Sequence, residues 1–357
     1  MIHWRAGTVR RLGREWPGAL ELAVDTADGE LLALAYPALV GRPAIGDTVL
    51  LNTTALRLAL GTGGYALVVA LPDRLPADPT GPGHLVKARY TPLQTVVLGV
   101  EEPGSPHHGV MADADSLDGM PVVVADLHSA LPAVVAGVRA DQPGARIAYL
   151  MTDGGALPLW YSRTVAALSH LLCGTVTVGQ AFGGELEAVT LYSGLLAARH
   201  VLGADLAVVT QGPGNLGTGT RWGFSGVAAG EAVNAVAALG GRPVAALRLS
   251  GADPRARHRG VSHHSLTAYG RVALARADVV VPAELSSSLA AELAPLAKRH
   301  ALVRVGTGGL AEALHDLPVE LSTMGRGLAD DADYFLAAAA AGRHAAALWA
   351  AQPTASR

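Results

Sequence analysis

The chain has 357 residues, half of them hydrophobic and 16% charged, and carries a formal net charge of −3. This length suits about two domains with sizeable cores, and the weak negative charge argues against a nucleic-acid partner. The single cysteine, Cys173, excludes an intramolecular disulfide and a thiolate-rich zinc site. The stretch MIHWRAGTVRRLG lacks the apolar segment of a secretory signal, and the apolar runs are too short for a membrane span. We therefore expect a cytoplasmic protein with no membrane partner.

Residues 1–72 contain short runs typical of β-strands and no helical pattern. Turn signals such as Pro17-Gly18 and Asp28-Gly29 separate these runs. Five short strands with tight turns predict a small β-barrel of the SH3-like or OB type. Aromatic and basic side chains are too sparse for a nucleic-acid stacking platform, so we expect a structural barrel or one that supports a homo-oligomer. The runs are GTVRRLG, LELAVDT, ELLALAYP, DTVLLNTT and GGYALVVA.

Residues 73–119 are interpreted as a linker with connecting strands. The proline-rich stretch at 71–83 is typical of a linker. Two short strand-like runs follow, HLVKARY and LQTVVLGVEE, and then a polar loop. The pattern leaves open whether these two strands extend the barrel or form the edge of the next sheet.

Residues 120–350 show a different periodicity. A continuous apolar run followed by a helical pattern recurs seven times, beginning with PVVVADLHS and ending with ALVRVGTGG. Continuous apolar runs are typical of buried parallel strands, and right-handed crossovers place the helices on both faces of the sheet. The sequence therefore predicts a doubly wound, mainly parallel, Rossmann-like α/β domain after the barrel. In such a sheet the ligand crevice lies at the carboxyl ends of the strands.

The stretch TQGPGNLGTGTRWGFSG follows one of the buried strands and is the first candidate binding loop. Backbone amides, hydroxyl groups and one guanidinium suit a phosphate or carboxylate. A loop whose glycines serve only packing is the alternative. The candidate ligand-binding residues are Gly212, Gly214, Asn215, Gly217, Thr218, Gly219, Thr220 and Arg221, with Arg259 from a second loop.

The same stretch fits the letters of the dinucleotide fingerprint G-x-G-x-x-G but not its context. The expected helix starts only at Ser225 or Gly226, and no acidic residue follows at the next strand end. A phosphate-binding P-loop is excluded as well, because Thr218 stands where that motif requires a lysine. The sequence thus disfavours the usual NAD site and favours a less specific anion site.

A second loop, RHRGVSHHS, gathers basic side chains in an otherwise weakly charged chain. His263 and His264 are candidate acid–base catalysts, because an imidazole can transfer a proton near neutral pH. Asp153, at another strand end, is the third candidate catalytic residue; Asp126, Asp153 or Glu185 would orient the substrate or a metal. A solvated loop before the next helix is the alternative interpretation.

Asp126 and His128, two residues apart at a strand end, could point to one side and share a metal ion. Glu185, assigned to a neighbouring strand end, would complete a carboxylate and imidazole site for Mg²⁺, Mn²⁺ or Zn²⁺. A divalent metal is therefore a possible cofactor. The alternative is that Asp126 holds its own loop.

Four stretches together resemble an uncharacterised family of actinobacterial proteins, a domain of unknown function. The resemblance covers nearly the whole chain; it implies a bacterial protein and no particular activity or site residue. From the residues alone, we expect an α/β enzyme acting on a small anionic ligand, phosphorylated or nucleotide-like. The alternative is a non-catalytic ligand-sensing or assembly protein. The stretches are GDTVLLNTTALRLALGTGGYALVVA, HLVKARYTPLQTVVLGVEE, QGPGNLGTGTRWGFSG and RHRGVSHHSLTA.

Overall fold

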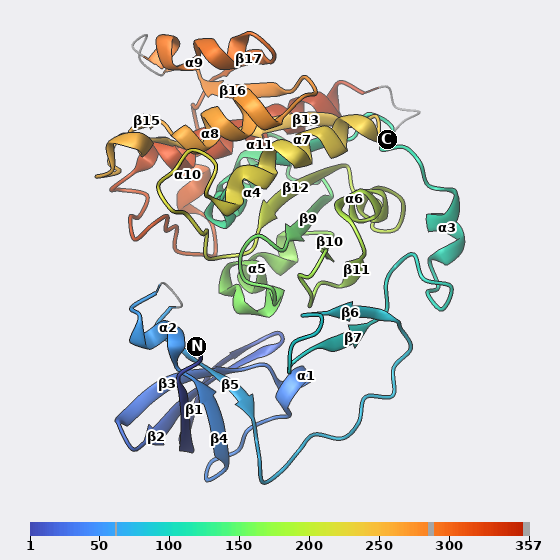
Figure 1. The fold of residues 1–357 in the computed structure, drawn as a ribbon. Helices are drawn as coiled ribbons and strands as arrows, with labels where there is room; N and C mark the ends of the chain where they lie inside the picture. Colours follow the sequence, from blue (N-terminus) through green and yellow to red (C-terminus); the bar gives the residue numbers. More distant parts are fainter. Residues whose placement is uncertain (61–62, 285–288, 353–357) are drawn as a thin grey trace. The chain divides into compact units, whose positions relative to one another are not determined.

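A computed structural model describes residues 1–60, 63–284 and 289–352 and divides the chain into two compact units. Unit 1 comprises Met1–Val97 and Trp160–Ala166, and unit 2 comprises Leu98–Leu159 and the chain from Ala167 onward. The predicted fold class is confirmed: a closed five-stranded barrel precedes an eight-stranded parallel sheet flanked by helices (Figure 1).

The barrel of unit 1 closes in the strand order β1-β2-β3-β5-β4, in which β3 and β5 are the parallel pair. Alternating apolar side chains such as Leu20, Leu22 and Val24 fill its interior. The predicted turn residue Gly29 has φ +108°, which a side chain would strain. The strands are β1 (Trp4–Trp16), β2 (Ala19–Thr26), β3 (Gly29–Ala35), β4 (Thr48–Asn52) and β5 (Ala66–Ala70), with short helices α1 (Pro37–Val40) and α2 (Thr54–Arg57).

The two strands that the sequence left unassigned neither join the barrel nor extend the large sheet. β6 (Leu85–Lys87) and β7 (Thr95–Val97) form an antiparallel two-stranded sheet of their own within unit 1. The second stretch of unit 1 includes the start of α5 (Arg163–Leu168). In it, the carbonyl of Trp160 accepts a hydrogen bond of 2.7 Å from the Trp16 indole.

The sheet of unit 2 has the order β11-β10-β9-β12-β8-β13-β16-β17, and every pair is parallel. Its central strands are buried almost throughout, as their continuous apolar runs predict. The short edge strand β11 was not expected. The strands are β8 (Pro121–Val124), β9 (Ile147–Thr152), β10 (Gly174–Val178), β11 (Leu186–Ala188), β12 (Leu206–Gln211), β13 (Arg242–Ala246), β16 (Asp278–Pro282) and β17 (Ala301–Val305).

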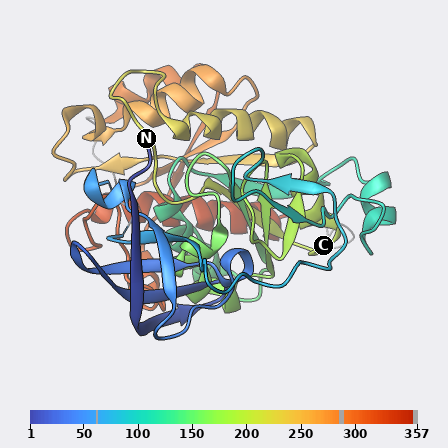
Figure 2. The same cartoon turned by 60° about the horizontal axis from the view of Figure 1, so that its bottom comes forward.

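Helices cover both faces of this sheet, yellow and orange on one side and red α11 on the other (Figure 2). One face carries α6 (Leu191–His200), α7 (Ala228–Ala238), α8 (His263–Thr267) and α9 (Leu289–Ala297). The other carries α4 (Leu131–Asp141), α10 (Leu310–His315) and α11 (Ala332–Ala350), and α3 (His108–Asp113) precedes the sheet. Among the residues described, no helix combines the length and apolar character needed to cross a membrane.

Helices α4 and α11 cross at a contact that leaves no room for side chains. A Cβ atom at Gly137 would lie 1.8 Å from the carbonyl oxygen of Ala339, and one at Gly342 would lie 2.1 Å from that of Val134. Reciprocal glycines therefore let the two backbones touch. Helix α11 was not predicted from the sequence; its alanine-rich run is buried over most of its length.

We expect Gly137→Ala to lower the free energy of unfolding by about 2 kcal/mol. Overpacking of this kind costs about 3 kcal/mol, and the better helix propensity of alanine returns about 1 kcal/mol. Urea unfolding followed by circular dichroism measures the change. The matched control is Gly144→Ala, where a Cβ would meet nothing within 4 Å. Equal midpoints for Gly137→Ala and the wild type would contradict the packing argument.

Candidate functional site

The strand order creates a topological switch point between β8 and β12. These strands are neighbours in the sheet, but the helices that follow them lie on opposite faces of it. β8 is followed by α4 on one face, and β12 is followed by α7 on the other. Ligand crevices of open α/β sheets lie at such points, outside the carboxyl ends. A hollow with room for a water-sized group lies here, so any larger ligand has to bind outside it, against the loops. Its lining includes Asp126, Thr152, Thr210, Gln211, Ser225 and Gly226.

Several glycines of the candidate binding loop are explained by packing. A Cβ at Gly212 would lie 2.3 Å from the carbonyl oxygen of Ala156, so this residue lets two loops touch through their backbones. A Cβ at Gly223 would lie 2.2 Å from the Thr218 hydroxyl and 2.6 Å from that of Thr220. The two threonine hydroxyls are 2.9 Å apart and are used within the loop. By contrast, Gly214, Gly217 and Gly219 are exposed.

Asn215 ties this loop to the helix that follows it. Its side-chain oxygen accepts hydrogen bonds from the Gln211 amide at 2.8 Å, and from the Ser225 hydroxyl and the Gly226 N–H at 3.3 Å. The helical segment begins with a 3₁₀ turn at Ser225–Val227, which confirms the delayed start predicted from the sequence. The Asn215 oxygen thus serves as a cap within the protein.

A buried ionic network surrounds Asp253, in the loop after β13. The Asp253 carboxylate accepts hydrogen bonds of 2.9 and 2.7 Å from Arg255 and one of 3.2 Å from Arg326, and Arg248 lies at 3.5 Å. Burial raises the pKa of Asp253, but the Arg255 hydrogen bonds and the Arg255 and Arg326 charges outweigh it, so the net pKa is lowered. Arg326 also contacts the buried Asp331 at 2.9 Å.

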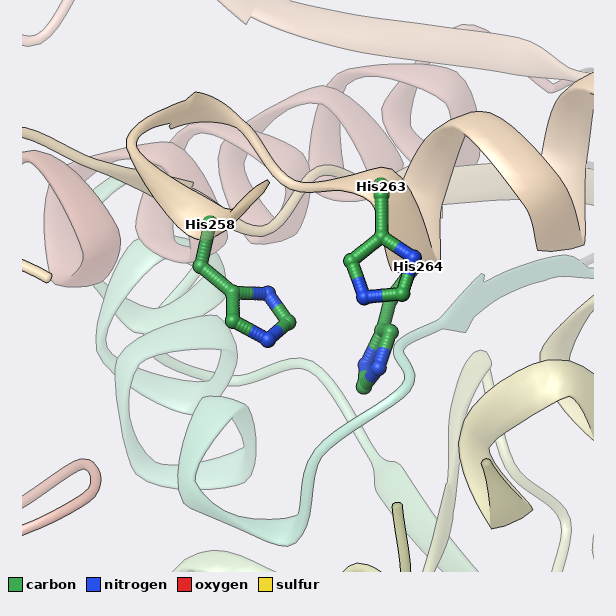
Figure 3. A group of neighbouring side chains, drawn as sticks. All are labelled: His258, His263 and His264. Atoms are coloured by element: carbon green, nitrogen blue, oxygen red, sulfur yellow. The ribbon is translucent and has the colours of Figure 1, made fainter. Parts of the chain in front are cut away.

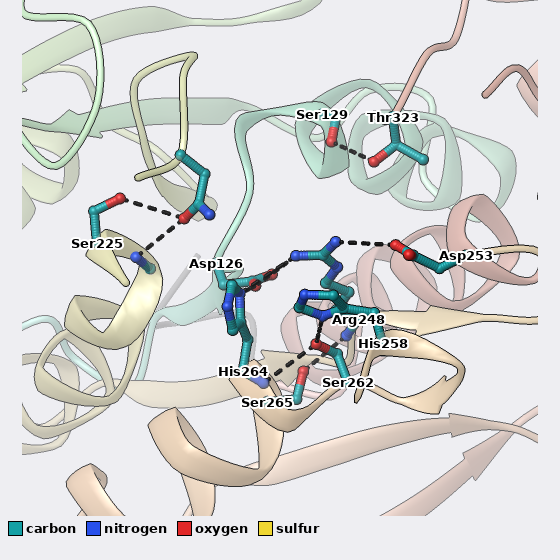
Figure 4. Close-up of polar contacts among 12 residues, drawn as sticks. Asp126, Ser129, Ser225, Arg248, Asp253, His258, Ser262, His264, Ser265 and Thr323 are labelled. Carbon is teal, nitrogen blue, oxygen red and sulfur yellow. Dashed lines mark hydrogen bonds and ion pairs between the residues drawn. The ribbon is translucent and has the colours of Figure 1, made fainter. Parts of the chain in front are cut away.

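Asp126 connects this network to α8. Its carboxylate oxygen lies 3.3 Å from Nδ1 of His264 and 4.0 Å from the Arg248 guanidinium, and all three side chains are buried (Figure 4). The ring of Phe224, which ends the glycine-rich loop, stacks on His264 with 3.8 Å between centroids. Arg248 was not predicted as a site residue, although a charged residue two positions after the end of the apolar strand β13 was a signal for it.

His258 and His263 lie beside His264, and both are held neutral. Burial lowers the pKa of His258 to about 3 and that of His263 to about 4, and the positive charge of Arg248 adds to both shifts. Nδ1 of His258 forms a 2.7 Å hydrogen bond with the Ser262 hydroxyl. Nε2 of His263 is buried and has no hydrogen-bond partner among the described residues.

The glycine-rich loop and the Arg/His-rich loop meet at Arg257. A Cβ at Gly219 would lie 3.7 Å from the Arg257 guanidinium carbon, and the Arg257 charge also lowers the pKa of His263. Arg221, Arg257 and Arg259 are exposed, and none forms an ion pair within the described part of the chain. The structure therefore places a guanidinium directly against the glycine-rich loop.

The structure does not bring Asp126, His128 and Glu185 together. β8 ends at Val124, so the alternation that would align Asp126 and His128 no longer applies, and Nδ1 of His128 instead bonds the Tyr149 hydroxyl at 2.9 Å. Glu185 precedes β11 at the amino edge of the sheet, where its N–H bonds Thr175 at 3.1 Å. The sequence assigned it to the carboxyl edge because β11 was not distinguished from the helix after it.

Asp153 does follow β9 at the carboxyl edge, where it is exposed and accepts a 2.9 Å hydrogen bond from the Gln180 N–H. Two strands, β12 and β8, separate β9 from β13, which leads to the histidine-bearing loop. In the part of the chain that is described, no contact joins Asp153 to His263 or His264. Asp153 therefore belongs to a separate section of this edge.

The chain matches the model of a protein family. A family model described as a protein of unknown function, DUF3866, covers residues 32–342. No curated protein matches the chain. The match confirms the family resemblance inferred from the sequence motifs, whereas an actinobacterial origin remains a prediction.

Replacing Asp253 tests the buried network. We expect Asp253→Asn to lower the free energy of unfolding by about 3–5 kcal/mol, because it leaves three guanidinium groups without their shared carboxylate. Chemical unfolding of both proteins measures the loss. Asp113→Asn, at an exposed position in α3, is the matched control and should change the value by less than about 0.5 kcal/mol. If the free energy of unfolding of Asp253→Asn changed as little as that of the control, the network would contribute little to stability.

His128 makes stability depend on pH. Burial lowers its pKa to about 4 from an ordinary 6.5, so below pH 6.5 the unfolded chain takes up a proton that the folded chain does not. The neutral, half-buried His128 ring therefore contributes fully to the free energy of unfolding above pH 6.5. As the pH falls toward 4, the free energy of unfolding decreases by about 2 kcal/mol because of this residue. We expect His128→Asn, which can keep the Tyr149 hydrogen bond, to remove that share of the pH dependence of unfolding. Exposed His315→Asn should leave it unchanged; identical profiles for both variants would contradict the assignment.

Proposed function

Because the chain belongs to DUF3866, a family of proteins of unknown function, its activity has to be inferred from its own residues. We propose that unit 2 is an α/β enzyme that binds a small anionic ligand, phosphorylated or nucleotide-like, at the carboxyl edge of the sheet. The single observation that carries this proposal is the position of the Arg257 guanidinium against Gly219 of the glycine-rich loop.

The charge at this edge supports an anion. The buried arginines are matched by the carboxylates of Asp126, Asp253 and Asp331, whereas Arg221 and Arg257 project from the loops without an ion pair in the described regions. A planar guanidinium offers paired N–H donors that suit phosphate and carboxylate oxygens. Unmatched exposed guanidinium groups beside a crevice therefore favour a negatively charged ligand.

The exposed part of the glycine-rich loop suits close contact with such a ligand. Gly214 and Gly219 have φ values of +90° and +80°, conformations in which the backbone lies open to an approaching group. The hydroxyls of Thr218 and Thr220 bond each other and can add a further donor or acceptor at the surface. In this proposal residues 214–221 contact the anion and Arg257 completes its pairing, with Arg259 on the same loop as Arg257.

The acid–base part of the proposal rests on His263 and His264. The Arg257 charge acts on the half-buried His263 ring, which is therefore near the proposed anion site. His264 lies behind it, with Asp126 at 3.3 Å from its Nδ1, an arrangement that orients an imidazole for proton transfer. In this scheme His263 contacts the ligand and His264 positions it. Asp153 would orient a more distant part of a larger ligand.

A second candidate is a ligand sensor without turnover. The observation that favours it is the burial of His264, which is covered by Phe224 and held by Asp126. An imidazole enclosed in this way stabilises the site without meeting a substrate. Detection of binding without product by phosphorus NMR would support this candidate, whereas a new phosphorus signal would support the enzyme.

We expect Arg257→Ala to weaken binding of the most tightly bound anion about 10- to 100-fold. This is the loss in affinity expected when one hydrogen bond to a charged group is removed. The ligand is chosen by thermal-shift screening of inorganic phosphate, nucleoside monophosphates and sugar phosphates, and isothermal titration calorimetry then gives its Kd. Raising the salt concentration should weaken binding further.

The control for this experiment is Arg271→Ala, which removes an exposed guanidinium from the π-helical turn that leads back to the start of β16. It should leave the Kd unchanged. If no compound in the panel raises the melting temperature, or if both variants bind like the wild type, the anion site is not at this edge.

A further inference from the structure

Three imidazoles converge beneath the Arg/His-rich loop. His258 lies in a short 3₁₀ turn, and His263 and His264 begin α8 (Figure 3). One ring nitrogen of each lies within 4.8 Å of the others. We infer that these three histidines bind one Zn²⁺ or a similar divalent first-row transition metal ion. The metal site does not depend on the anion contacts of Arg257 proposed above, and a metal bound here would replace the acid–base role proposed for His263 and His264.

The spacing of the rings suits a shared ligand after small adjustments. The ring centroids are 4.5 to 4.9 Å apart. In a tetrahedral zinc site, a metal–nitrogen distance of about 2.0–2.1 Å places the nitrogens roughly 3.3 Å from one another. Rotations that move each nitrogen by about 1 Å close the present separation. His263, which is only half-buried, has the most freedom to make this movement.

The outer hydrogen bonds are those expected of ligating histidines. Such residues donate the N–H that does not face the metal to a carboxylate or another oxygen. Nδ1 of His258 bonds the Ser262 hydroxyl at 2.7 Å, and Nδ1 of His264 faces Asp126 at 3.3 Å. Nε2 of both rings is then the ligand. Arg248 also lies 3.3 Å from Nδ1 of His264. With the metal on Nε2, Nδ1 carries the hydrogen and donates it to Asp126, so Arg248, itself a donor, makes no hydrogen bond to this nitrogen.

His263 supplies the independent observation that points to a ligand. Its Nε2 is shielded from solvent and has no hydrogen-bond partner among the residues that the structure describes. A buried nitrogen without a partner costs free energy, and a metal ion would satisfy it.

The donor set selects the class of metal. Three imidazoles suit Zn²⁺ and its neighbours, whereas Mg²⁺ and Ca²⁺ require oxygen ligands. Sites with three protein ligands leave a fourth position for water or an anion, unlike closed structural sites. Asp126 then acts through His264 as a positioning residue, a different role from the ligand predicted from the sequence.

The test is a metal titration of the full-length, untagged protein after dialysis against a chelator. Zn²⁺ is added in competition with a chromophoric chelator, and Co²⁺ is added in a parallel experiment to record its visible d–d absorption. We expect one equivalent per chain and a Co²⁺ spectrum of a low-symmetry, nitrogen-ligated site. His263→Ala should weaken Zn²⁺ binding by at least about 100-fold, because it removes a metal ligand. Loss of a ligand lowers metal affinity more than loss of a residue that only hydrogen-bonds to a ligand.

Two further variants keep the result interpretable. His315→Ala removes an exposed imidazole from α10 and should bind Zn²⁺ like the wild type. Asp126→Asn should weaken binding about 10- to 100-fold and alter the Co²⁺ spectrum if Asp126 orients His264; circular dichroism confirms that each variant is folded. Failure of the wild type to take up one equivalent, or equal affinity in folded His263→Ala, would overturn the inference.

Discussion

The candidate site depends on the neutralisation of buried carboxylates at the carboxyl edge of the sheet. Asp126, Asp253 and Asp331 are each almost fully buried, and a buried charge is tolerated only when it is paired and hydrogen-bonded. Arg248 reaches Asp126 and Asp253 from the end of β13, while Arg326 joins Asp253 to Asp331. Residues distant in the chain are thereby held at one place, and the loop that carries His258 is held with them.

The same buried surroundings also determine the protonation state of His258 and His263. Burial is the main cause of the lowered pKa of His258 and His263, and the charge of Arg248, which also pairs with the buried carboxylates, adds to both shifts. The same region therefore combines buried ion pairs with neutral imidazoles. Phe224, stacked on His264, connects the glycine-rich loop to α8. Anion binding would use the exposed guanidinium groups and metal binding the buried ring nitrogens, so either can occur without the other. The acid–base role proposed for His263 and His264 uses the same rings as the metal, so those two roles exclude each other.

The glycine-rich loop shows why a motif has to be judged by its context. Its letters match a dinucleotide fingerprint, yet Gly212 and Gly223 are required by packing, because a Cβ at either position would lie within 2.3 Å of a neighbouring oxygen. Asn215 occupies the helix start that a pyrophosphate would contact in that motif. What distinguishes the loop is its neighbour Arg257, which comes from a segment about 40 residues later in the sequence.

The sequence by itself determined the barrel, the parallel sheet and the edge of the sheet at which polar side chains gather, because apolar periodicity and turn residues are local properties. It also determined the late helix start at Ser225, since glycine and polar residues before it disfavour an earlier one. Only the tertiary structure decided which polar side chains meet. Glu185 lies at the opposite edge because a three-residue strand intervenes, and His128 turns to Tyr149 because β8 has already ended. The contacts of Arg248 with Asp126 and Asp253, and the convergence of three imidazoles, follow from strand order and loop packing, which no local pattern encodes.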